Sequence, residues 1–261
     1  DMSPYEVVPM LLDQGRYICS VRTIYRPSGK EDLIHQRDGS KKRQKRAKPP
    51  QRIATGPNEV WCWDITWLAA AIKGLFFYAY VIIDIFDRSI VGWAVHDKES
   101  DVHSRDLFEM LSMGRDIIFG YLHSDNGFPM KGSTLMAFLD TLNVKVSFSR
   151  PRTSNDNPYI ESLFRTIKYS SGYPIRFRDI EHAREWMADF VNWYNTEHLH
   201  SSIGYVTPEQ LRDGSATDIF KNRNEVMQRA KLENPECWGS RETICWGSPE
   251  KVVLNPEKSK C

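Results

Sequence analysis

A succession of apolar runs, separated by short polar turns, is the feature that most limits how this chain can fold. Residues 61–67, 75–85 and 90–95 are rich in β-branched and aromatic side chains, and only a few residues lie between one run and the next. Runs of this composition predict β-strands. Because connections this short do not allow a crossover, we expect the three strands to pair antiparallel.

The apolar spacing becomes helical after residue 100. It predicts helices over about 100–113, 133–142 and 179–195, whereas shorter apolar stretches within 117–123 and at 144–148 predict two further strands. Strands that alternate with helices favour parallel pairing through crossovers. The expected fold class is therefore α/β, with a mixed five-stranded sheet, made of three antiparallel strands plus βα crossovers, and helices on both faces.

The composition of the 261 residues is that of a folded protein without disulfides. Apolar residues make up 41% of the chain, which is enough for a sizeable core. The longest strongly apolar stretch, at 75–83, is too short to span a membrane, and no signal peptide is visible, so no membrane partner is expected. The cysteines are scattered, which predicts a reducing compartment and neither a disulfide framework nor a zinc site.

The net charge of +1 hides an uneven distribution. Residues 1–60 hold 12 basic and 7 acidic side chains, whereas residues 61–125 hold 5 basic and 10 acidic ones. This asymmetry suggests a part that binds a polyanion beside a part that binds metal. The basic residues that cluster toward the end of residues 1–60 are Lys41, Lys42, Arg43, Lys45, Arg46, Lys48 and Arg52. These residues suit a solvated tether and also a contact with phosphates, and one segment can serve in both ways.

Three carboxylates on three separate elements are the candidates for a metal site. Asp64 lies within the first strand, between Trp63 and Trp67, where an unpaired charge is costly. Asp125 lies in a turn that follows a strand, where open α/β sheets place their sites. Each also has an ordinary structural interpretation, because Asp64 can point to solvent or bind an arginine, and an Asp before Asn-Gly commonly forms a turn.

The third carboxylate, Glu161, begins a helix. Asn157 suits the N-cap of this helix and Pro158 suits its first position. Residues at helical spacing form a buried stripe, whereas Glu161, Arg165 and Lys168 fall on a different face. The glutamate can therefore bind metal while the basic residues hold a phosphate backbone, although taken alone Glu161 and Arg165 also suit an ordinary surface ion pair. The members of the buried stripe are Ile160, Leu163, Phe164 and Ile167.

Other acids compete for the same interpretation. Asp84 and Asp87 lie beside Arg88 at the end of a strand, so we expect them to shape a hairpin. Asp156 precedes the Glu161 helix and has the position of a turn residue. We therefore rank Asp64, Asp125 and Glu161 above them. Three oxygen ligands of this kind can converge on a pair of divalent ions, which is what in-line chemistry on a phosphodiester requires.

The spacing of these acids resembles a known signature. Sixty residues separate Asp64 from Asp125, thirty-five separate Asp125 from Glu161, and Lys168 follows seven positions later. This pattern is similar to the D,D(35)E signature of retroviral-type integrases and bacterial insertion-sequence transposases. The flanking sequence motifs are similar to those in the OrfB half of the transposases made from overlapping OrfA and OrfB frames. These motifs are PNEVW before WDIT, IVGW at 90–93, HSDNG at 123–127, SRP at 149–151, SNDNP at 154–158, WYN at 193–195 and GYVTP at 204–208.

The resemblance implies a ribonuclease-H-like core that transfers phosphoryl groups on DNA. Asp64 and Asp125 would share one Mg²⁺ ion, and Asp64 and Glu161 a second, with Mn²⁺ as a substitute. The site would cut an insertion-sequence end and then join it to a new strand by transesterification with a 3′-hydroxyl. Besides Lys168 and Arg165, the side chains expected to contact DNA are Arg150, Arg152 and the basic cluster Lys41, Lys42, Arg43, Lys45 and Arg46.

Four parts are expected along the chain. Residues 1–36 would form a small helical segment similar to a helix-turn-helix, and 37–56 a basic linker. The integrase catalytic core would span 57–212, followed at 213–261 by a tail with short strands. The helices near the N-terminus suit either a DNA contact or a packing appendage, because Pro27 ends the second of them early.

The resemblance also implies the partners and the location. These are double-stranded DNA at both the element's ends and the target, a homodimer or larger assembly on that DNA, and an OrfA-type protein. A bacterial cytoplasmic protein associated with the nucleoid is expected. Two alternatives stay open: a catalytically inactive DNA-binding derivative, and a plain nuclease of the ribonuclease H kind.

Overall fold

The computed structural model describes residues 4–20, 22–24, 26, 48–113, 120–151, 153–238 and 242–257. The chain divides into two units, Asp1–Arg46 and Ala47–Cys261. In the first unit the described helix is α1, Pro4–Asp13. Within the described ranges, none of the helices is both long and apolar enough to cross a membrane.

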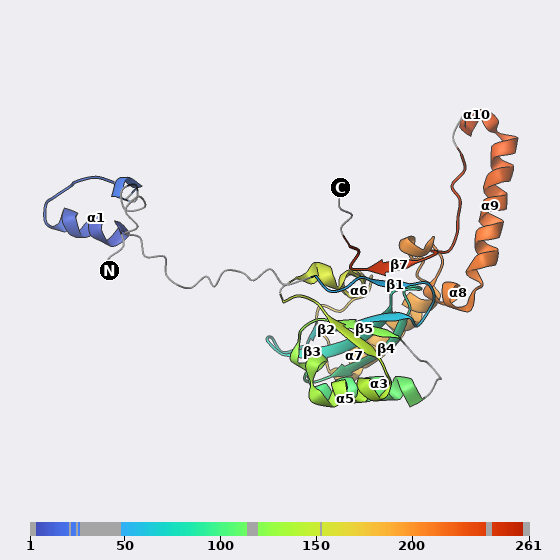
Figure 1. Cartoon of the computed structure of the whole chain (residues 1–261), viewed down its shortest axis with the longest axis horizontal. Coiled ribbons are helices and arrows are strands. Elements are labelled where there is room, and N and C mark those ends of the chain that lie inside the picture. The colour runs from blue at the N-terminus through green and yellow to red at the C-terminus, as the bar shows by residue number, and fades with distance from the viewer. Residues whose placement is uncertain are drawn as a thin grey trace. The chain divides into compact units, whose positions relative to one another are not determined.

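The second unit is built on a mixed five-stranded sheet in the order β4-β3-β2-β5-β6 (Figure 1). The first three strands along the chain pair antiparallel, whereas β5 pairs parallel to β2 and β6 parallel to β5. The sequence prediction of three hairpin-linked strands followed by crossovers is therefore confirmed. The strands are β2 Val60–Ala69, β3 Phe76–Asp84, β4 Ile90–His96, β5 Tyr121–Ser124 and β6 Lys145–Phe148.

Helices cover both faces of this sheet. One face packs against α3, Asp101–Met113, and α5, Ser133–Thr141, which lie side by side in Figure 1. The other face packs against α6, Pro158–Tyr169, and α7, Ile180–Thr196. The alternation of side chains along a strand decides which residues meet which pair of helices. In β2, Trp61 and Trp63 belong to the core with α3 and α5, whereas Val60 and Cys62 belong to the core with α6 and α7.

The helix α6 follows the predicted stripe. Ile160, Leu163 and Ile167 are fully buried against the sheet, while Arg165 and Lys168 are exposed. Asn157 occupies the N-cap position as expected, but its side chain makes no capping hydrogen bond. This end of the helix therefore depends on contacts with other parts of the molecule.

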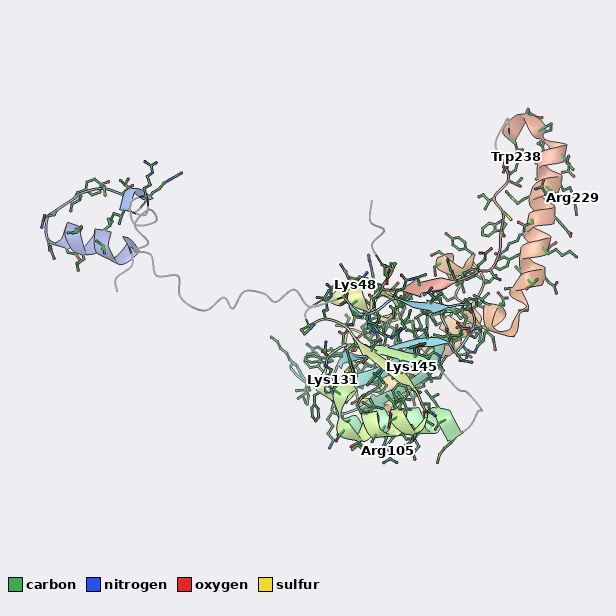
Figure 2. The ribbon with its side chains drawn as sticks, in the orientation of Figure 1. Lys48, Arg105, Lys131, Lys145, Arg229 and Trp238 are labelled. Carbon is green, nitrogen blue, oxygen red and sulfur yellow. The ribbon has the colours of Figure 1, made fainter. Side chains whose placement is uncertain are left out.

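The segment 213–261, for which the sequence indicated a tail with short strands, holds more helix than expected. Its longest element is α9, Ala216–Glu233, which extends away from the sheet and carries Arg229 (Figures 1 and 2). The chain then returns as the short strand β7, Val252–Leu254. This strand pairs antiparallel with β1, Arg52–Ala54, which lies inside the stretch expected to be a basic linker. The remaining elements are α4 Phe128–Lys131, the 3-10 turns η1 Ser154–Asp156 and η2 Ser201–Ile203, α8 Pro208–Asp213 and α10 Pro235–Trp238.

A buried ion-pair network attaches α8 to the sheet. Arg212 donates to Asp87 at 2.8 Å and lies 3.6 Å from Asp84, and both carboxylates are fully buried. Burial and the neighbouring Asp87 raise the pKa of Asp84 to about 6. The two acids therefore hold the C-terminal region in place, in addition to shaping the hairpin as the sequence suggested.

We expect Arg212→Gln to lower the free energy of unfolding by about 3 kcal/mol at pH 8, because it leaves two buried carboxylates without their cation. The loss should be smaller at pH 5, since the raised pKa of Asp84 means that its carboxylate is protonated there in the folded state. Urea unfolding at pH 8 and at pH 5 measures the loss in the free energy of unfolding at each pH.

The matched control is Arg105→Gln at a position marked in Figure 2, which removes a partly exposed ion pair with Glu109 on α3. Its cost should stay below about 1 kcal/mol at either pH. Equal losses for the two variants would contradict the role assigned to Arg212.

Candidate active site

Parallel pairing of β2 and β5 brings the first two candidate acids together. Trp63 pairs with Ser124 in the register of these strands, and Asp64 and Asp125 are the next residue on each. Because parallel strands run in the same direction, both acids emerge at the same level of the sheet. Asp64 and Asp125, which are separated by sixty residues in the sequence, therefore lie on neighbouring strands.

The third candidate acid, Glu161, is on α6, which packs against the face of β2 that carries Asp64. Along β2, Cys62 lies in the apolar core that contains Ile160 of α6, and Asp64 follows on the same face of the strand. Asn157 ties the start of the helix to the strand, since its Nδ2 donates to the carbonyl of Trp63 at 3.5 Å. Glu161 is half-buried and lies one turn into the helix.

The electrostatics of Asp64 show that the other two candidate acids lie near it. Burial, together with the nearby charges of Asp125, Glu161 and Glu99, raises the pKa of its carboxyl from 3.8 to about 7. The backbone N–H of Ile65, which donates to this carboxylate at 2.8 Å, opposes the shift. An acid whose pKa is raised by other acids lies where negative charge is concentrated. A cation placed there would be attracted by all of them.

Asp125 has a buried carboxylate oxygen that is unpaired within the described part of the chain. Its Oδ1 is buried and has no hydrogen-bond partner among the described residues. A buried carboxylate oxygen left in this state is costly unless an ion or another group completes it. The orphaned oxygen therefore fits the prediction that Asp125 is a ligand.

The donor set fits Mg²⁺ in its chemistry, because all the candidate ligands are carboxylate oxygens. Within the described parts of the chain, no three Asp, Glu, His or Cys side chains converge tightly enough to hold a single ion. The sequence hypothesis does not require three protein ligands on one ion. It assigns two acids to each ion, with Asp64 common to both, and Mg²⁺ usually keeps several waters beside one or two carboxylates.

The rival acids are engaged elsewhere. Asp84 and Asp87 bind Arg212, as described above. Asp156 accepts two hydrogen bonds of 2.9 Å from the guanidinium of Arg150, which hold the pKa of this carboxyl below its usual range. The sequence ranking of the acids thus agrees with their surroundings.

The residues predicted to contact DNA have different environments. Arg165 and Lys168 are exposed on α6, and the Arg165 guanidinium lies 5.9 Å from the ring centroid of Tyr169. Arg150 is committed to its ion pair with Asp156, a use that the sequence did not indicate. Arg152 and the basic cluster Lys41, Lys42, Arg43, Lys45 and Arg46 lie outside the described residues.

A histidine supports the strand that leads to Asp125. His123 is fully buried, and its ring nitrogens lie 2.8 Å from the hydroxyl of Ser147 and 3.2 Å from that of Ser149. Burial lowers the pKa of this imidazole, which favours the neutral ring. His123 therefore ties β5 to the end of β6 rather than reaching into the site.

Contacts around the start of α6 involve residues that the sequence did not single out. The Arg88 guanidinium lies 4.3 Å from the ring centroid of Tyr159, and the Tyr159 hydroxyl donates to the carbonyl of Val253 at 2.9 Å. Asn255 donates to the carbonyl of Asp156 at 3.2 Å. No local pattern links positions nearly a hundred residues apart, so a single sequence carries no signal for these contacts.

Comparison with known proteins identifies the family to which this core is related. Two models of the integrase core domain match the chain, one over residues 54–154 and the other over 142–208. The transposase for insertion sequence element IS904 of Lactococcus lactis is 30% identical over 161 residues, which cover 60% of this chain and 62% of that protein. The putative transposase InsK for insertion sequence element IS150 of Escherichia coli is 25% identical, over 61% of this chain and 56% of that protein.

These matches span less than two thirds of the length of the curated relatives. Among solved structures, the chain is similar to one in a simian T-cell lymphotropic virus intasome, determined in complex with the PP2A regulatory subunit B56 gamma. The TM-score is 0.51 at 15% identity, over 80% of this chain and 74% of the other. At this identity the likeness concerns the fold, which is the ribonuclease-H-like arrangement expected from the sequence. Residues 54–208 of this chain thus match the integrase core domain, and the proteins similar to the chain include insertion-sequence transposases.

Proposed function

We propose that this chain is a DNA transposase that uses divalent metal ions to cut and join DNA strands at insertion-sequence ends. The observation that carries the proposal is that Asp64 and Asp125 follow paired positions of neighbouring strands on an integrase core, where the charges of Asp125 and Glu161 help to raise the pKa of Asp64 to about 7. The names of the relatives, which are transposases for insertion sequences, give the class of substrate.

The residues have separate roles in this proposal. Asp64 and Asp125 would hold one Mg²⁺ ion and Asp64 and Glu161 a second, with Mn²⁺ able to replace either. Bound in this way, the ions would favour deprotonation of the attacking water or 3′-hydroxyl and would stabilise the leaving oxygen. Asp64 would be a ligand of both ions. Its carboxyl must lose its proton before it can act as a ligand.

The DNA would lie along the exposed side of α6. Arg165 and Lys168 follow Glu161 at one and two turns, so both can hold the phosphate backbone of a strand whose scissile bond lies at the acids. Arg152 and the basic cluster Lys41, Lys42, Arg43, Lys45 and Arg46 would extend this contact. Arg150 is better suited to hold the loop before α6, because Asp156 already neutralises its charge.

The assembly on DNA is part of the same proposal. Two ends must be held together for transposition, which favours a homodimer or a larger complex on DNA, with an OrfA-type protein as a further partner. We also propose that residues 1–36 and the basic linker act in DNA recognition, that 57–212 is the catalytic core, and that the protein acts in the bacterial cytoplasm at the nucleoid.

Purified protein should nick and join labelled insertion-sequence ends in Mg²⁺ or Mn²⁺. Asp64→Asn, Asp125→Asn and Glu161→Gln should each lower the rate by roughly 10³-fold or more, the scale of loss when one member of a catalytic set is removed. The exposed acids Asp189 and Glu185 on α7 provide matched controls, and their amide variants should retain full activity.

Rates measured on gels with the protein in excess test this prediction. Strong DNA binding without any metal-dependent cleavage would contradict it and would favour the repurposed DNA-binding derivative. Cleavage of RNA–DNA hybrids without strand joining would instead indicate a plain nuclease.

The raised pKa of Asp64 predicts how stability depends on pH in the absence of metal. Because its folded-state pKa of about 7 lies above the ordinary 3.8, the folded protein holds this proton more tightly, and the stability it contributes is lost as the pH rises through 7. Asp64→Asn should therefore melt at a higher temperature than the wild type at pH 8, and by a smaller margin at pH 5.

Adding Mg²⁺ should reverse the order at pH 8, since it stabilises the wild type and not the variant. Thermal unfolding in a chelator and in Mg²⁺ measures both effects, with Asp189→Asn as the control. If the melting temperature of the wild type at pH 8 is the same with and without Mg²⁺, the proposed metal site is contradicted.

Arg165→Ala and Lys168→Ala should weaken binding to all DNA sequences alike. Each change should also reduce the slope of log K against log salt concentration by about 1, because one phosphate contact is lost. Fluorescence anisotropy over a range of salt concentrations measures the slope. Arg105→Ala, on the opposite side of the sheet, should leave it unchanged, and an unchanged slope in all three variants would exclude α6 from the DNA contact.

A further inference from the structure

The last strand of the chain lies against the segment that carries Glu161. β7 pairs with β1 so that Leu254 is opposite Arg52 and Val252 is opposite Ala54. Val252 and Leu254 are buried in the same apolar core as Ile160 of α6. Figure 1 shows β1, β7 and α6 together on one side of the sheet. The chain thus leaves the core through α8 and α9 and returns to it beside the catalytic helix.

Two hydrogen bonds connect this strand to the start of the helix. The hydroxyl of Tyr159 donates to the carbonyl of Val253 at 2.9 Å, and Nδ2 of Asn255 donates to the carbonyl of Asp156 at 3.2 Å. Asp156 and Tyr159 lie on either side of the N-cap residue Asn157. The beginning of α6 is therefore held from both sides by residues 253–255.

The helix has no cap of its own to replace these contacts. Asn157 has backbone angles of φ −128° and ψ 58°, and its side chain makes no capping hydrogen bond. The carboxylate of Asp156, which precedes it, is bound by Arg150. Because the first N–H groups of a helix lack partners inside the helix, the position of this end is decided by its tertiary contacts.

Further contacts continue the pairing beyond the two strands. Nζ of Lys48 donates to the carbonyl of Pro256 at 2.7 Å, and the N–H of Glu257 donates to Oε1 of Gln51 at 2.9 Å. Figure 2 marks Lys48 at the start of this unit. Residues 48–54 and 252–257 together form a strap, which joins both ends of the folded unit over the start of α6.

We propose that this strap is a positioning element for Glu161, acting through Tyr159 and Asn255. Glu161 lies two residues after Tyr159, so a shift of the first helical turn carries the carboxylate with it. A displacement of about 1 Å in a catalytic site is enough to cost on the order of 10²-fold in rate. The inference rests on the proposed function, because it assigns to the strap the placement of a metal ligand.

Asn255→Gly is the sharpest test. Asn255 has a φ of 54°, so glycine keeps this left-handed backbone while removing the side-chain bond to Asp156. The matched control is Asn143→Gly, because Asn143 has a φ of 55° and lies exposed in the turn after α5. Tyr159→Phe serves as a second variant, which removes the hydroxyl that donates to Val253 and leaves the ring in place.

Three readouts distinguish positioning from simple anchoring. Amide hydrogen exchange over residues 157–165 should become faster in Asn255→Gly and Tyr159→Phe but not in Asn143→Gly. Calorimetry without DNA should show Mn²⁺ binding weakened several-fold. The Mg²⁺ concentration that gives half-maximal nicking should rise several-fold, kcat should fall about tenfold, and the Kd for DNA should stay unchanged.

A lowered melting temperature with unchanged exchange in α6 and an unchanged Mg²⁺ requirement would overturn the proposal and leave the strap a structural anchor. If the wild type itself neither binds metal nor nicks DNA, the proposed function fails. The hydrogen-exchange result then decides alone whether the strap holds the helix.

Discussion

The parallel pairing of β5 with the first residues of β2 is the interaction on which the rest of this structure depends. It reduces a separation of sixty residues to the distance between neighbouring strands and places Asp64 and Asp125 at one level of the sheet. It also makes β2 the junction between the antiparallel half and the crossover half of the fold. The helices α3 and α5 can then close one face and α6 and α7 the other, so that Glu161 approaches Asp64 from the α6 face.

Bringing three carboxylates together in a half-buried place opposes folding, because their charges repel and lose water. The raised pKa of Asp64 and the orphaned oxygen of Asp125 are the signs of this cost. Elsewhere in the same unit, buried acids are neutralised by arginines, as with Asp84, Asp87 and Arg212 or Asp156 and Arg150. The contrast between compensated and uncompensated acids separates the structural carboxylates from the proposed metal ligands more clearly than their exposure does.

Much of the core was predictable because its signals are local. The run from 61 to 95 predicts hairpins by composition and turn spacing, and the buried stripe of α6 follows from its periodicity, so both agreed with the structure to within a few residues. The region after residue 213 was predicted less well. The helix α9 is only weakly amphipathic and has few buried residues. Its sequence therefore lacks the apolar periodicity that predicts a helix. Likewise, β1 is three residues long, and its pairing with β7 depends on a partner two hundred residues away.

By itself the sequence determined the acid types, their spacing and the helix face of Glu161, and the predicted site residues follow from these properties of the chain. It also determined the order of the strands and helices in the core, through periodicity and short connections. Only the tertiary structure decided which acids are compensated, that Arg150 is used by Asp156, and that residues 253–255 hold the start of α6. These outcomes depend on contacts between distant segments, and the energy of such a contact is set by geometry and burial in the folded state, which no local pattern encodes.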